Sequence, residues 1–135
     1  MRAEKTRARI LRMPNRLERI IENDPKFGIE AYLFVFEALA VAQKLFKHKR
    51  HVTGKELLEG IKALAHERYG RIAKSVLNSW GVHTTDDFGT IVFHLVNAGL
   101  MSKTTKDRPE DFHAVYDFDQ AFIRDYHISD ESHNH

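Results

Sequence analysis

Basic side chains are the residues of this chain whose types and spacing best suit binding chemistry. They are concentrated in 44–51, "KLFKHKRH", and in the polar segment that follows residue 102. Ammonium and guanidinium groups bind phosphate oxygens, and such contacts supply nearly all sequence-independent affinity for nucleic acids. The candidate contacts are Lys47, Lys49, Arg50, Lys103, Lys106 and Arg108. Because cations near the C-terminus of a helix also complement its dipole, a purely structural interpretation of 44–51 stays open.

Glu37 is the only charged residue in the apolar run 31–42, "AYLFVFEALAVA". Burial of a carboxyl raises its pKa, and a perturbed pKa is typical of catalytic acids and bases. Glu37 is therefore the candidate buried acid. The alternative, which the sequence favours, is a Glu at the edge of the helix or paired with a neighbouring cation.

Motifs for metal binding and catalysis are missing from the sequence. The chain has nine histidines and no cysteine. His48 and His51 are three residues apart but lie among Lys and Arg, which repel a metal ion, and no third ligand stands nearby. No Ser lies in a G-x-S-x-G elbow, and no glycine-rich phosphate loop is present. We expect no metal, no cofactor and no catalytic residue, and a function outside catalysis.

The length of 135 residues suits one domain. Residues 1–13 are expected to form a frayed basic arm, 14–126 a single domain and 127–135 a disordered tail. The formal net charge of +2 conceals a basic start and an acidic end of the chain. Such asymmetry is typical of interaction tails, although two solvated ends explain it equally well.

Apolar periodicity and capping signals predict a mostly helical domain. Thr53 with Glu56, and Thr84 with Asp87, have the spacing of a capping box, in which two side chains satisfy the first backbone donors of a helix. The expected helices cover about 14–23, 29–47, 53–69, 72–80 and 84–97. We also expect a short edge strand at 51–53.

Residues 81–103, "GVHTTDDFGTIVFHLVNAGLMSK", follow the order of a helix-turn-helix with a wing. A helix that reads DNA needs Arg, Lys, Asn or Gln donors for bases and phosphates. Helix 84–98 instead begins with Asp86 and Asp87 and is otherwise largely apolar. The sequence predicts a winged-helix-like shape and argues against DNA recognition by this helix.

A small C-terminal β-hairpin is expected from 100–104 and 111–118, because apolar and polar residues alternate in "DFHAVYDF". The edge of this hairpin would offer Phe112, Tyr116 and Phe118 to a partner strand. This edge favours a protein-interaction module with an unidentified protein partner. The alternative function is sequence-independent nucleic-acid binding through the basic N-terminal arm, the 44–51 cluster and the tip of the hairpin. The alternative role for the aromatic residues is to complete the core.

No segment is long and apolar enough to predict a transmembrane helix, and no apolar secretory signal is present. We expect a cytoplasmic protein without membrane contact.

Four longer motifs of the chain are "YLFVFEAL" (32–39), "HVTGKELLEGIKALA" (51–65), "SWGVHTTDDFGTIVFHLVNAGLMSKT" (79–104) and "DFHAVYDF" (111–118). Together they resemble a locus-tag-named family of small uncharacterised bacterial proteins. The resemblance covers about residues 24–122 and implies a cytoplasmic bacterial protein, with no catalytic or binding residues to carry over. The segment before Pro14 is longer than the usual start of that family, which makes Met13 an alternative first residue.

Overall fold

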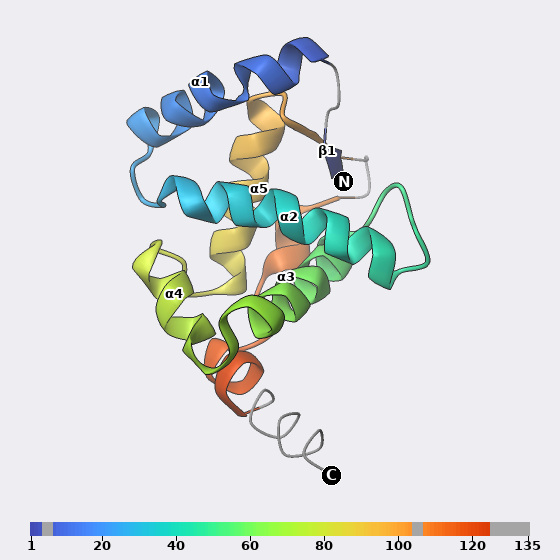
Figure 1. Ribbon diagram of the computed structural model, residues 1–135, viewed down its shortest axis with the longest axis vertical. Coiled ribbons are helices and arrows are strands. Elements are labelled where there is room, and N and C mark those ends of the chain that lie inside the picture. The colour runs from blue at the N-terminus through green and yellow to red at the C-terminus, as the bar shows by residue number, and fades with distance from the viewer. Residues whose placement is uncertain (4–6, 104–106, 125–135) are drawn as a thin grey trace.

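The computed structural model describes residues 1–3, 7–103 and 107–124, and in its first helix only the side chains from residue 15 onward. The expected mostly helical class is confirmed (Figure 1). The helices are α1 (Arg7–Asn23), α2 (Ile29–Leu45), α3 (Gly54–Tyr69), α4 (Ala73–Ser79) and α5 (Thr85–Asn97). Three short turns of 3-10 or π-helix join or follow them: η1 (Gly70–Ile72), η2 (Pro109–Phe112) and η3 (Gln120–Arg124).

Both expected capping boxes are present. At α3 the Thr53 hydroxyl accepts from the Glu56 amide at 3.1 Å, and the Glu56 carboxylate accepts from the Thr53 amide at 2.8 Å. At α5 the Asp87 carboxylate accepts from the amides of His83 at 2.8 Å and Thr84 at 3.2 Å. These local bonds set both helix starts.

The centre of the fold is the packing of α2 against α3. A Cβ placed on Gly60 would lie 2.6 Å from the Ala38 carbonyl oxygen and 2.7 Å from Ala42 Cβ. The missing side chain at Gly60 therefore lets the two backbones approach closely. Tyr32, Phe34 and Leu57 are among the fully buried residues of this core.

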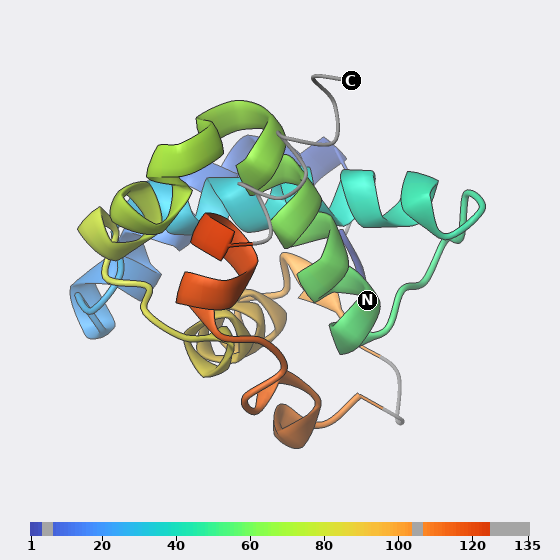
Figure 2. The same cartoon turned by 90° about the horizontal axis from the view of Figure 1, so that it is seen from below.

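Helix α5 runs behind α2, and its C-terminal end meets α1, which crosses the top of the molecule (Figure 1). Phe88, Ile91 and Leu95 of α5 are fully buried. At the opposite end, seen from below, η3 packs against α3 and α4, whereas η2 packs against α5 and α3 (Figure 2). No helix in the described part of the chain is long and apolar enough to cross a membrane.

The expected C-terminal hairpin is wrong. Strand β2 (Met101–Ser102) does form within 100–104, but it pairs antiparallel with β1 (Arg2–Ala3) at the start of the chain. Residues 51–53 are not a strand either, although Val52 exchanges backbone hydrogen bonds with Met1. Alternating apolar and polar residues indicate a strand, but they do not specify which distant segment pairs with it.

Residues 111–118 form no strand because local bonds favour a turn. Pro109 begins the 3-10 turn η2, and the Asp111 carboxylate accepts from the Arg108 amide at 3.0 Å. Ala114 has φ +46°, in the left-handed region that strands do not use. After this turn the chain forms the short helical turn η3 over Gln120–Arg124.

The segment expected as a frayed arm is ordered where the structure describes it. Met1 is buried in the core, residues 2 and 3 form β1, and α1 begins at Arg7 instead of at Pro14. Apolar burial of Met1 and strand pairing hold this segment in place. The expected tail, 127–135, lies outside the described residues.

Candidate functional site

Three segments that are far apart in the sequence meet at one end of the molecule. The Met1 ammonium donates to the Val52 carbonyl at 2.7 Å and lies 3.9 Å from an Asp107 oxygen. Residues 1–3, the loop 46–53 that follows α2, and the segments on either side of 104–106 are therefore neighbours. We call this region the basic end; its basic residues are Arg2, Lys47, His48, Lys49, Arg50, His51 and Lys103.

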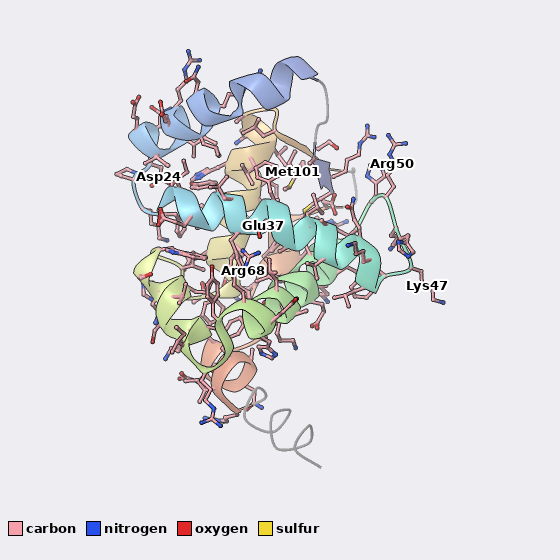
Figure 3. The ribbon with its side chains drawn as sticks, viewed as in Figure 1. Asp24, Glu37, Lys47, Arg50, Arg68 and Met101 are labelled. Carbon is pink, nitrogen blue, oxygen red and sulfur yellow. The ribbon has the colours of Figure 1, made fainter. Side chains whose placement is uncertain are left out.

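The loop after α2 is held in a defined shape. Lys47 and His48 have φ of +63° and +59°, an arrangement uncommon for residues other than glycine. The Lys49 amide donates to the Gln43 carbonyl at 3.0 Å, and the Gln43 side-chain amide donates to the Arg50 carbonyl at 2.8 Å. Gln43 thus fixes both sides of the turn. Lys47 and Arg50 lie on its outer side (Figure 3).

The charges of this loop are only partly neutralised. Lys49 pairs with Glu56 at 2.8 Å. Lys47 and Arg50 are exposed, and no carboxylate of the described residues pairs with either. Desolvation and the positive charges of the Met1 ammonium, Arg2 and Arg50 hold the pKa of His51 below its usual value. The Met1 ammonium, Arg2 and Arg50 thus add to the effect of desolvation on His51.

A hollow of about 300 Å³ lies between the C-terminal half of α2 and the loop. Its walls include Gln43, Lys44, His48, Lys49 and Arg50. The hollow is open to solvent, so an anion can approach these cations without any change in the fold.

The later candidate contacts are partly brought to the same end. Lys103 directly follows β2, and its ammonium lies 5.1 Å from the centre of the Phe93 ring. Arg108 is exposed and follows Asp107. Lys106 lies outside the described residues.

Gln43 is not among the candidate residues predicted from the sequence, and Arg2 is included there only as part of the basic arm. Arg2 stands opposite Ser102 in the β1–β2 pair. Its Nε and the Ser102 hydroxyl are buried and have no hydrogen-bond partner among the described residues. Arg2 lies near the loop only because Met1 forms hydrogen bonds with Val52, a contact between distant segments. Gln43, near the end of α2, belongs to no sequence motif that would single it out.

The proposed partner edge at 111–118 is wrong. Phe112 and Phe118 are buried, and no strand edge exists there. The Tyr116 hydroxyl donates to the Leu58 carbonyl at 2.9 Å, and burial raises the pKa of Tyr116. Phe112 occupies space over Gly54 and Gly89, where a Cβ would come within 3.0 Å of the ring or closer. The aromatic residues complete the core, which was the alternative interpretation.

Glu37 is not a buried acid. It lies on an exposed face of α2 and pairs with Arg68 of α3 (Figure 3). Its carboxylate raises the pKa of the Arg68 guanidinium. The alternative of an edge Glu paired with a cation is confirmed.

No protein-family model, curated protein or solved structure matches this chain. No group of three or more His, Asp or Glu side chains is arranged to hold a metal ion within residues 1–3, 7–103 and 107–124. Support for a function of the basic end therefore comes from its own geometry.

Proposed function

We propose that the protein binds nucleic acid without sequence specificity, through phosphate contacts at the basic end. The observation that carries this proposal is the convergence of Arg2, the loop cations Lys47 and Arg50, and Lys103 on one end of the molecule. No carboxylate in the described part of the chain forms an ion pair with these cations, and a cluster of unpaired cations drawn from separate segments is the electrostatic footprint of phosphate binding.

The geometry of the loop supports the same proposal. Gln43 holds the backbone that carries Lys47 and Arg50, so less conformational entropy is lost when these side chains bind. The buried Arg2 Nε and Ser102 hydroxyl are donors next to this surface that lack acceptors among the described residues. An ordered water or an anion oxygen would satisfy them.

The proposal does not use α5. Its buried face packs in the core, and Asp87 is paired with Lys26 at 3.0 Å. A recognition helix has to offer a free polar face to the major groove. We propose a winged-helix-like shape for α3 to α5, without the DNA-reading role that the second helix has in that motif.

The test is fluorescence anisotropy with a labelled random DNA duplex and a labelled single-stranded RNA, at low and at physiological salt. The variant carries Lys47→Ala and Arg50→Ala. We expect clearly weaker binding, and a log–log salt slope smaller by about 2, because each lost phosphate contact contributes roughly one.

The matched control carries Lys62→Ala and Lys74→Ala, which removes the same charge from residues paired with Glu59 and Asp119. It should keep the wild-type salt slope. No binding by the wild-type protein, or an equal loss in the control, contradicts the proposal.

A protein-interaction module is the second candidate, and exposed apolar residues favour it. Ile72 in η1 is 61 % exposed and Ile123 in η3 is 47 % exposed, and these two turns contact each other. Exposed apolar patches often mark protein-binding surfaces. If the wild-type protein captures a partner that an Ile72→Asp variant loses and a Leu33→Asp variant keeps, this candidate gains support.

A further inference from the structure

A cleft between α1 and α5 has the features of a second binding site, and it lies far from the basic end. Its volume is about 480 Å³, which is in the range of small-molecule sites. Helix α1 contributes Arg16, Arg19 and Ile20, and α5 contributes His94 and Asn97. Asp24, at the rim, lies at the opposite end of α2 from Lys47 and Arg50 (Figure 3).

One wall of the cleft is cationic. The Arg16 guanidinium donates from Nη1 to the Ala98 carbonyl at 2.7 Å. This bond fixes the guanidinium at the C-terminal end of α5, where the helix dipole favours a cation. It uses one of the five donors of the group. Arg19 is exposed beside the same cleft.

The floor of the cleft holds an imidazole with a defined orientation. The Tyr32 hydroxyl lies 2.8 Å from His94 Nδ1, and Asp24 lies 3.5 Å from His94 Nε2. Burial, with the charge of Asp24 as a smaller cause, raises the pKa of Tyr32 to about 12, so this hydroxyl keeps its proton at neutral pH.

The direction of the hydrogen bond between the Tyr32 hydroxyl and His94 Nδ1 is set by the hydroxyl proton, which needs an acceptor. The Tyr32 side chain is fully buried, and His94 is its one hydrogen-bond partner among the described residues. The hydroxyl must therefore donate to Nδ1, since a buried donor without an acceptor is costly. The ring proton of neutral His94 is then on Nε2, and this side chain is 23 % exposed at the cleft. This donor faces Asp24, whose carboxylate oxygen lies 3.5 Å from Nε2.

From this arrangement we infer that the α1–α5 cleft binds a small organic anion, held by its carboxylate or phosphate group between Arg16 and Arg19. Planar guanidinium groups match the paired oxygens of such anions. The Asp24 carboxylate lies beside His94 Nε2 and repels an oxyanion from the His94 side of the cleft. It therefore favours a ligand with a hydroxyl or amino donor near the acidic group. Asn97 supplies a further polar group at the wall.

The experiment titrates the full chain with succinate, glucose 6-phosphate, AMP and inorganic phosphate at pH 7. Binding is followed through the imidazole resonances of His94 by NMR and through the thermal unfolding midpoint. We expect saturable shifts of His94 with at least one organic probe. Comparison of succinate with the phosphate esters identifies the acidic group that the cleft prefers.

The decisive variant is Arg19→Ala, because Arg19 is exposed and its loss leaves the core intact. We expect its affinity for the best probe to fall at least tenfold, with partial recovery in Arg19→Lys. The matched control is Arg124→Ala, an exposed Arg of η3 that bonds only to Gln120 in its own turn among the described residues; it should bind like the wild type.

Failure of all four probes to shift His94, or an equal loss of affinity in Arg124→Ala, would overturn the inference. A response to inorganic phosphate that never saturates would also count against it, because that is the behaviour of nonspecific ion binding. The nucleic-acid proposal is separate, since Arg19→Ala leaves Lys47 and Arg50 in place.

Discussion

The side-chain amide of Gln43 donates a hydrogen bond to the carbonyl oxygen of Arg50, 2.8 Å away, across the turn that follows α2. The Gln43 carbonyl also accepts from the Lys49 amide, so one residue fixes the turn from two sides. The two left-handed residues between these bonds, Lys47 and His48, are thereby held in an uncommon conformation. The shape of the proposed phosphate-binding loop thus depends on an uncharged residue of the preceding helix.

Gln43→Ala should weaken nucleic-acid binding several-fold without removing any charge. The lost hydrogen bond should lower the free energy of unfolding by about 1 kcal/mol, and the loop should become more mobile. Anisotropy and urea denaturation measure the two effects. A Gln120→Ala variant, which changes η3 instead, should bind normally. Undiminished affinity in Gln43→Ala would show that loop shape is irrelevant to binding.

Asp87 should stabilise the fold in a pH-dependent manner. Its burial pushes the pKa up, but hydrogen bonds from the His83 amide and the Lys26 ammonium outweigh burial and hold the pKa below the ordinary 3.8. A depressed pKa gives stability that is present above the unfolded value and lost as pH falls through the folded one. Asp87→Ala should therefore cost about 2 kcal/mol at neutral pH.

The measurement for Asp87 is urea denaturation of the wild type and Asp87→Ala between pH 7 and pH 2.5. The difference between their midpoints should stay constant down to about pH 5 and shrink below 3.8. A difference that is independent of pH across this range would assign the stabilisation to packing instead of charge.

Gly60→Ala should destabilise the protein by about 1–3 kcal/mol, the usual cost of overpacking. The new methyl group would meet the backbone of α2 at Ala38 and Ala42, which cannot rotate away. Thermal or urea unfolding measures this loss. Gly28→Ser is the matched control, because its Cβ would meet only the flexible Glu30 side chain and Ser is a preferred residue at this helix N-cap. Equal stability of the two variants would contradict the close packing of α2 on α3.

Glu37→Gln should change stability by less than about 1 kcal/mol. Its partner Arg68 and Glu37 itself are 41 % and 49 % exposed, and exposed ion pairs contribute little because water and salt screen them. Urea denaturation at low and high salt measures the effect, which should vanish at high salt. A loss of several kcal/mol would indicate a buried role that this geometry does not have.

The local sequence determined most of the helical structure. The capping boxes at Thr53 and Thr84 and the glycine with φ +88° at Gly81 set helix ends through bonds within a few residues. The all-round apolar character of 29–45 placed α2 at the centre, since such a helix is stable only when surrounded. Glu37 at an edge followed from the same pattern, because one carboxylate on an apolar helix avoids the buried side.

Tertiary structure alone decided the partners of these elements. Alternation in 111–118 suggested a strand, but Phe112 is buried over Gly54 and Gly89, residues distant in sequence. Strand β2 pairs with residues 2–3, and hydrogen bonds between Met1 and Val52 place this strand pair at the end of the molecule that carries the loop. Tyr32, His94 and Asp24 likewise meet only because α2 and α5 cross. Hydrogen bonds within one turn of chain can be read from a sequence, whereas contacts between distant segments depend on how the whole core packs.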